Sequence, residues 1–183
     1  MNCKAALLLF SCSFIFGSLI ADSGAASSDV EDAVLSLKAA FGKPIPPEVF
    51  GKGDRTTRRS TVLNFTGDSR KFAYSAKSTS RTYSKATSSE TTSPVVIVRT
   101  SQALFSDLKA VSREKSDLMG KAVDLDTLTI LCGPDKECFK STGPDVVIGS
   151  GGLHGAQPIQ FADPEAAAEA KRAIEILIQA NSR

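Results

Sequence analysis

Hydrophobic and polar positions follow a helical period most clearly near the C-terminal end of the chain. Asp163 is a favourable N-cap residue, Pro164 suits the first helical position, and Glu165 complements the positive end of a helix dipole. The apolar residues that follow share one helical face, and they are Ala166, Ala170, Ala173, Ile174, Leu177 and Ile178. The pattern predicts a C-terminal helix whose alanine-rich face lies close to a sheet.

A shorter amphipathic helix is predicted over residues 28–41. Ser28 and Glu31 have the spacing of a capping box, and Gly42 and the prolines after it end the pattern. The apolar stripe of this helix consists of Val30, Val34, Leu37 and Phe41. We expect the stripe to pack on the core of the same chain, with a partner-binding helix as the alternative.

Alternation with a period of two predicts strands between the two helices. Residues 61–66 and 71–76 alternate on either side of a turn signal at 67–69, which predicts a hairpin. Residues 95–98 form an apolar, β-branched run that is typical of a buried strand. Further strands are expected over residues 125–131, 145–148 and 158–161.

The segments between these elements differ in composition. Residues 43–59 are rich in Pro, Gly and charge and are predicted to be a linker. Residues 77–93 are nearly all Ser, Thr, Lys and Arg, and they fit either a long mobile loop or an exposed edge strand. A short helix is expected over residues 103–111 and a flexible turn over 149–152. Strands in the middle with helices at both ends indicate an α+β fold.

The first 26 residues have the layout of a secretory signal peptide. One positive charge precedes an apolar run over residues 5–21, and small residues follow. We expect cleavage after Ala25 or Ala26, with a retained anchor or lipidation at Cys12 as alternatives. The predicted location is therefore secreted or periplasmic, with no transmembrane span after processing. The chain divides into a signal peptide (1–26), a helix with its linker (27–59) and a single α+β domain (60–183).

The predicted location affects the expected oxidation state of the two cysteines that remain after cleavage. Cys132 and Cys138 would lie in an oxidising compartment, and they flank a turn in which Pro134 suits position i+1 of type I. We predict a disulfide between opposed positions of a hairpin. A redox or metal pair would need C-x-x-C spacing and further ligands, so neither a metal nor a cofactor is expected.

The formal net charge of +2 conceals a basic middle segment. Residues 52–99 hold ten Lys and Arg against three Asp and Glu. Such a segment can contact an anionic polymer or surface, and the alternative is a solvated, Ser/Thr-rich face. No aromatic platform alternates with the charges, so specific nucleic-acid binding is not expected. The candidate contacts for an anionic ligand are Arg58, Arg59, Arg70 and Lys71.

Residues suited to catalysis are sparse. His154 is the only histidine, and a secreted hydrolase that uses it as a base is an alternative function, although no G-x-S-x-G motif accompanies it. We expect an exposed loop at His154. Asp124 and Asp126 would share a strand face, where a solubility device on an edge strand is expected rather than a glycosidase pair. We therefore expect a non-enzymatic module that binds an extracellular or envelope protein or polymer.

Residues 123–178 resemble the C-terminal half of small secreted proteins with a pleckstrin-homology-like domain. The shared pattern is a strand that ends in a Cys-turn-Cys element, a second strand over 158–161 and a helix that begins Asp163-Pro164-Glu165-Ala166. The resemblance implies a bent antiparallel sheet or half-barrel that the C-terminal helix closes at one end. It implies no activity, and phosphoinositide binding does not carry over, because the helix lacks the Trp of lipid-binding relatives.

Overall fold

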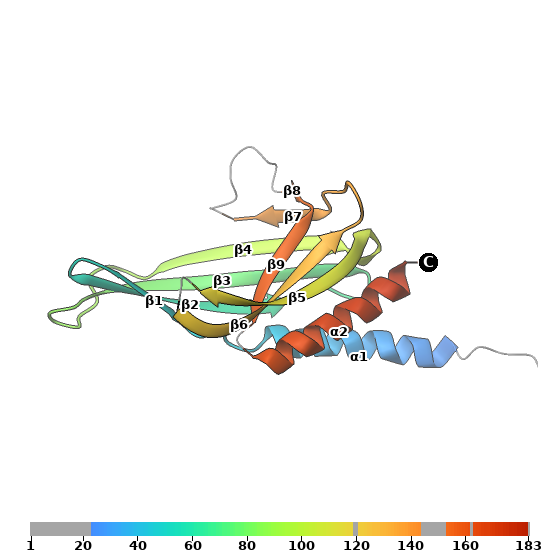
Figure 1. The fold of residues 1–183 in the computed structure, drawn as a ribbon, viewed down its shortest axis with the longest axis horizontal. Helices are drawn as coiled ribbons and strands as arrows, with labels where there is room; N and C mark the ends of the chain where they lie inside the picture. The colour runs from blue at the N-terminus through green and yellow to red at the C-terminus, as the bar shows by residue number, and fades with distance from the viewer. Residues whose placement is uncertain (1–22, 119–120, 144–152, 162, 183) are drawn as a thin grey trace, which may run out of the picture.

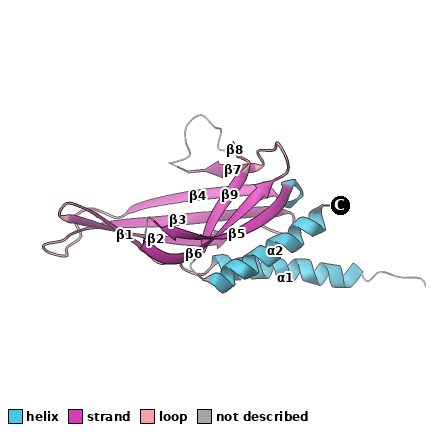
Figure 2. Cartoon of the chain, viewed as in Figure 1, coloured by secondary structure: helices cyan, strands magenta, loops and turns pink. Residues whose placement is uncertain are grey.

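The structure is a computed structural model, and its described residues are 23–118, 121–143, 153–161 and 163–182. Within them the chain folds as α+β, with two α-helices and two antiparallel sheets (Figure 1). The helices lie together on one side of the strands (Figure 2). Most of the expected signal peptide, the strand over 145–148 and the turn over 149–152 fall outside the described residues.

The larger sheet has six strands in the order β1-β2-β3-β4-β7-β8, and each pairs antiparallel with its neighbours. The strands are β1 (Glu48–Lys52), β2 (Arg55–Phe65), β3 (Lys71–Ser84), β4 (Val95–Leu104), β7 (Phe139–Thr142) and β8 (Leu153–His154). The hairpin predicted around residues 67–69 is confirmed by β2 and β3. The linker predicted over 43–59 is wrong in its second half, where β1 pairs with β2. Gly53 makes this hairpin possible, because its φ of +61° suits a tight turn between strands.

The smaller sheet has three strands in the order β5-β6-β9. They are β5 (Leu108–Leu118), β6 (Lys121–Cys132) and β9 (Ala156–Phe161), which confirms the strands expected over 125–131 and 158–161. The helix expected over 103–111 is wrong, because the end of β4, one 3-10 turn (Phe105–Asp107) and the start of β5 occupy it. Buried Ala103 and Phe105 alternate with exposed Leu104, which is the period of a strand. The described strands do not close into a barrel.

Both predicted helices are present, as α1 (Ser23–Phe41) and α2 (Pro164–Asn181), and they lie side by side (Figure 1). The capping box predicted at Ser28 and Glu31 is wrong, because both residues lie inside α1. The stripe of α1 faces the core, as expected, with Leu37 and Phe41 fully buried. The predicted face of α2 is buried along its whole length. This face packs against α1 as well as against the smaller sheet.

Asp163 holds the two helices together at one end. Its side chain accepts hydrogen bonds from the backbone N–H groups of Glu165 and Ala166 at 2.9 and 3.3 Å, which confirms the predicted N-cap. Lys43, just after α1, lies 2.6 Å from the same carboxylate. The hydrogen bond from Lys43, followed by those from the backbone, lowers the pKa of Asp163.

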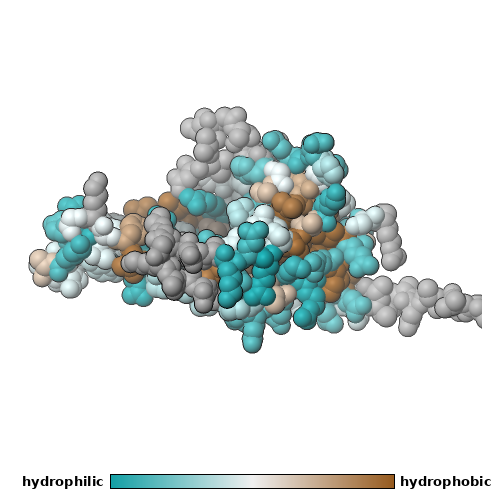
Figure 3. Space-filling view, viewed as in Figure 1, coloured by the Kyte–Doolittle hydropathy of each residue, from teal (hydrophilic) through white to brown (hydrophobic). Residues whose placement is uncertain are grey.

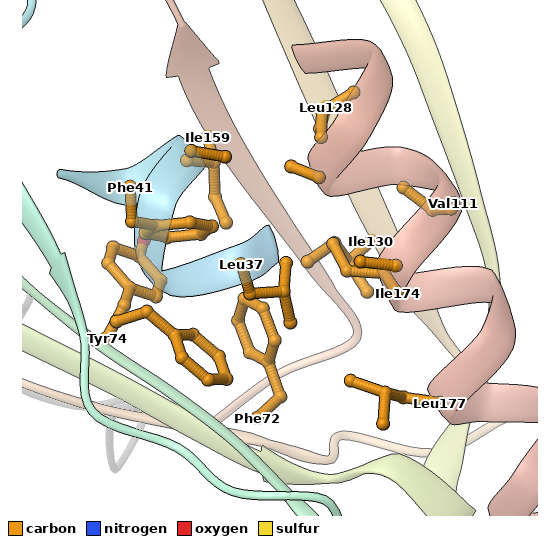
Figure 4. Close-up of a cluster of buried hydrophobic side chains, with 14 of the residues drawn as sticks. Leu37, Phe41, Phe72, Tyr74, Val111, Leu128, Ile130, Ile159, Ile174 and Leu177 are labelled. Atoms are coloured by element: carbon orange, nitrogen blue, oxygen red, sulfur yellow. The ribbon is translucent and has the colours of Figure 1, made fainter. Parts of the chain in front are cut away.

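Aromatic rings join α1 and both sheets into one core, to which α2 adds aliphatic side chains (Figure 4). Phe72 of β3 is fully buried, and its ring centroid lies between 5.8 and 6.1 Å from those of Phe41, Phe65, Tyr74, Phe105 and Phe139. Phe41, at the end of α1, also meets Phe161 of β9 at 5.3 Å. These separations favour edge-to-face attraction in addition to the burial of apolar area.

Candidate binding surface

The larger sheet is longer than the core that it covers. Residues 48–62 and 77–99 contain the far ends of β1 to β4 and the turns between them, and this part of the sheet is called the arm below. It extends beyond both helices (Figure 1, left). Strand β3 has 14 residues and spans about 45 Å at the usual rise of a strand. None of the described side chains of the arm is buried.

The structure corrects two predictions from the sequence that concern the arm. The run at 95–98 does form a strand, but its predicted burial is wrong, since Val95, Val96 and Val98 are 56, 51 and 49 % exposed. The segment at 77–93 is a strand as far as Ser84, and it is paired on both sides as far as Ser80, so the edge-strand alternative is wrong for residues 77–80. Among the described residues, the smaller sheet meets the arm at its base, near Thr61 and Ser78, while the valines of β4 remain accessible to solvent.

Positive charge is concentrated in the arm. Its residues include eight Lys and Arg against three Asp and Glu, whereas the rest of the chain has fourteen against seventeen. Charges gathered in this way raise the local concentration of an oppositely charged partner and accelerate its association. The basic middle of the sequence therefore becomes a distinct basic end of the molecule.

Strand register divides the arm into two faces. The even-numbered residues of β2 alternate with buried Leu63 and Phe65 and lie on the side away from the core, which is called the outer face. On this face Arg58 lies directly opposite Arg81. Like charges at opposed positions destabilise a sheet. The Arg81 guanidinium lies 3.2 Å from the Glu90 carboxylate, which offsets part of this repulsion.

Apolar side chains lie among the cations of the outer face. Val62 and Val98 flank Lys77 in one cross-strand row, and Val49 lies opposite Arg58 in another. The valines are close to half exposed. Figure 3 shows one side of the molecule, on which apolar and hydrophilic surface lie beside each other over the arm. The outer face thus offers apolar area and positive charge at neighbouring positions.

A hollow of about 430 Å³ lies at the tip of the arm on the outer face. Among its described lining residues, Arg58 and Lys85 are charged, and the others are Val49, Thr56, Tyr83, Ser84 and Ser88. The Lys85 ammonium donates a hydrogen bond to the Gly53 carbonyl at 2.7 Å, which joins the two turns of the tip. The hollow combines two cations, several hydroxyl groups and no carboxylate.

The four basic residues predicted as contacts do not form one site. Arg58 lies on the outer face of the arm, whereas Arg59 lies on the inner face, 3.6 Å from the Glu48 carboxylate. Arg70 and Lys71 lie at the opposite end of β2 and β3, where their backbone N–H groups bind the Asp68 side chain. The residues that join Arg58 instead are Lys77, Arg81 and Lys85, and only the pairing of β2 with β3 brings them together.

The predicted disulfide is confirmed, with the Cα atoms of Cys132 and Cys138 5.8 Å apart. The predicted hairpin is wrong, because Cys132 ends β6 in the smaller sheet and Cys138 precedes β7 in the larger sheet. Asp135 has a φ of +56°, and with Pro134 before it this is the pattern of a type II turn rather than the predicted type I. The disulfide therefore joins the two sheets.

His154 lies beside this disulfide. It belongs to β8, where it pairs with Phe139 of β7, and it is half-buried. Its carbonyl oxygen is 3.5 Å from the Cys132 sulfur. The exposed loop expected at this position is wrong, because β8 adds to the edge of the larger sheet.

Asp126 has a structural role that the sequence did not indicate. Strand β6 lies between β5 and β9, so the predicted edge strand is wrong, and Asp126 is buried. Arg113 of β5 donates a hydrogen bond to its carboxylate at 2.8 Å. This hydrogen bond lowers the pKa of Asp126, while burial acts in the opposite direction. The side chain of Asp124 lies outside the described part of the structure.

The described residues offer no other kind of site. They contain no group of three side chains that could hold a metal ion, and every buried side-chain nitrogen or oxygen has a hydrogen-bond partner. No helix in this part of the chain is both long and apolar enough to cross a membrane. Comparison of the chain with protein-family models, curated proteins and solved structures gives no significant match. Within the described residues, the arm is therefore the candidate binding surface.

Proposed function

We propose that this protein is a secreted or periplasmic, non-enzymatic binding module that holds an acidic protein partner on the outer face of its arm. The observation that carries the proposal is the opposed pair Arg58 and Arg81 with Lys77 and Lys85 nearby, on a sheet face that no other part of the described chain covers. The like charges of these side chains lower the stability of the sheet, but they would favour the binding of an acidic partner, which would relieve their repulsion.

The exposed valines support a protein partner rather than a polysaccharide or a nucleic acid. Val62, Val96 and Val98 present apolar area between the cations, and such area contributes when a partner removes it from water. A sulfated or phosphorylated polymer would use the charges alone. A partner that carries both carboxylates and apolar side chains would use the whole face.

The location and the family resemblance are also proposals. The apolar run before Ser23 supports secretion, and the disulfide is of the kind that persists in oxidising compartments. The pleckstrin-homology-like resemblance is supported by the order of β6, the Cys-turn-Cys element, β9 and α2. The described contacts of His154 are with strand β7 and the disulfide, and we therefore put forward binding rather than hydrolysis.

The test measures the binding of a soluble, fluorescently labelled peptide of Glu, Val and Gly. Binding is detected by fluorescence anisotropy at low and at physiological salt concentrations. We expect saturable binding that weakens as salt rises, because salt screens these exposed charges. R58Q/R81Q should weaken binding by about tenfold or more. The matched control, R70Q/K71Q, removes the same charge from the other end of β2 and β3 and should bind like the wild type.

Three results would contradict the proposal. R70Q/K71Q could weaken peptide binding as much as R58Q/R81Q does, which would show attraction by net charge alone. A sulfated polysaccharide or anionic vesicles could bind while the peptide does not, which would assign the arm to another class of partner. Replacing Val62 and Val98 with Thr could leave peptide binding unchanged, which would remove the argument for a protein.

A further inference from the structure

A groove of about 290 Å³ lies on the inner face of the larger sheet, where the arm leaves the core. Residues of β2, β3 and β4 form one wall, and Pro158 and Gln160 of β9 with Thr127 of β6 form the other. The groove is on the face opposite to Arg58 and Arg81, so it is separate from the surface proposed to bind a protein. Its size is near the lower limit of small-molecule sites in proteins, about 300 Å³.

The base of the groove is apolar. Leu63, Tyr74 and Ile159 line it and are at most 8 % exposed, so their positions are set by the core beneath. Ile45 and Ala76 also line the groove and pack against the same core. Tyr74 and Ile159 lie on either side of Phe41 in Figure 4. An apolar body placed here would lie against side chains that already pack on the core.

Among the described residues, the rim of the groove is polar and includes more positive than negative side chains. Its charged lining residues are Arg59, Arg99 and Glu48. Hydroxyl groups of Thr61 and Ser78, 3.0 Å apart, lie between the rim and the apolar base. Arg99 is close enough to Tyr74 for its positive charge to lower the pKa of the phenol, against the larger opposite effect of burial.

We infer that this groove binds a small amphipathic anion, which places an apolar body on Leu63, Ala76 and Ile159 and a carboxylate or similar head at the arginines. Two guanidinium groups at the rim suit such a head, because arginine donates paired hydrogen bonds to planar oxyanions. An apolar base alone would not distinguish a charged ligand from a neutral one. The arginines at the rim add a preference for an anion, so base and rim together define the ligand class.

Glu48 allows a test that is specific for an anionic ligand in the groove. Its carboxylate lies 3.6 Å from the Arg59 guanidinium, which also lies over the Phe50 ring at 5.2 Å. The Glu48 carboxylate therefore offsets part of the positive charge of Arg59 and would repel an anionic head. Removing its charge should tighten binding of an anion and should not affect binding of a neutral ligand.

The experiment uses the full chain with octanoate as the probe and with octanol and octylammonium as matched ligands. The chain has no Trp and only two Tyr, so Y83F leaves Tyr74 as the single fluorescent reporter in the groove. We expect octanoate to change Tyr74 emission saturably and octylammonium to leave it unchanged. R99Q should weaken octanoate binding by about tenfold, and E48Q should strengthen it several-fold.

R58Q is the matched control, because it removes an arginine from the opposite face of the same arm. It should leave octanoate binding unchanged while it weakens the acidic peptide, so the two proposals fail separately. R59Q, at an exposed side chain, repeats the test if R99Q does not fold. Equal binding of octanoate and octylammonium, equal losses in R58Q and R99Q, or no change in Tyr74 emission would each overturn the inference.

Discussion

Cys132 and Cys138 connect the two sheets of this protein, although only five residues separate them in the chain. One cysteine ends β6 in the smaller sheet, and the other precedes β7 in the larger sheet. The bond therefore fixes the point at which the chain leaves one sheet for the other, beside buried Phe139.

Loss of this bond should lower stability without unfolding the chain. For a loop of this length, the entropy that the crosslink removes from the unfolded chain corresponds to about 2 kcal/mol. We expect C132S/C138S to lower the free energy of unfolding by this amount, measured by urea denaturation. The same loss should follow reduction of the wild type. A double variant as stable as the oxidised protein would contradict this role.

The pair of Arg113 and Asp126 should make stability depend on pH in the acid range. Because the pKa of Asp126 is lowered in the folded state, its contribution is complete above its unfolded pKa, about 4, and is lost as the pH falls through the folded value. D126N should lower the free energy of unfolding at pH 7 by about 2 kcal/mol.

The difference between D126N and the wild type should then narrow below about pH 4. Urea denaturation of both proteins at pH 7, 5, 4 and 3 measures this difference in the free energy of unfolding. R113Q should show the same trend, because it removes the other partner of the pair. A difference that stays constant from pH 7 to pH 3 would show that the ion pair is not its cause.

Tyr74 should make stability depend on pH in the alkaline range. Burial raises the pKa of its phenol to about 12 from 10.0. The unfolded chain ionises first, so this contribution to stability is lost as the pH rises from about 10 to about 12. The free energy of unfolding should fall more steeply over this interval in the wild type than in Y74F. Parallel curves would contradict the assignment.

Phe72 and Val96 should respond very differently to substitution. Phe72 is fully buried among five rings, and F72A should lower the free energy of unfolding by about 3–5 kcal/mol. Val96 lies half exposed in the arm, and V96T should change the free energy of unfolding by about 0.5 kcal/mol or less. Chemical denaturation of both variants measures the contrast. A loss above about 2 kcal/mol in V96T would mean that another layer covers the arm.

Secretion predicts a specific mature N-terminus. Among the described side chains of α1, core contacts begin at Val30, so cleavage after Ala25 or Ala26 would leave the described buried residues of the helix in place. Intact mass of protein from its own secretory route should start at Ala26 or Ser27 and rise by two hydrogens on reduction. A mass that keeps the first residues, or includes a lipid at Cys12, would indicate a protein tethered to a membrane.

Local signals in the sequence predicted the elements whose side chains define them directly. Asp163-Pro164 marks the start of α2 because the cap and the proline act within one helical turn. Gly67 and Asp68 similarly mark the turn between β2 and β3. The prediction over 103–111 failed because Leu104, Leu108 and Val111 fit a helical stripe, while Ala103 and Phe105 alternate as strand residues around a 3-10 turn.

The sequence by itself determined both helices, the β2–β3 hairpin, the disulfide pair and the excess of positive charge in the middle of the chain. Only the tertiary structure decided that Arg58 lies opposite Arg81, that Val96 is exposed, that Asp126 is buried and that the disulfide joins two sheets. Composition and spacing report on neighbours within a few residues. Strand register and the coverage of a sheet depend on segments far apart in the chain, and a strand pattern is the same whether or not another layer packs on it.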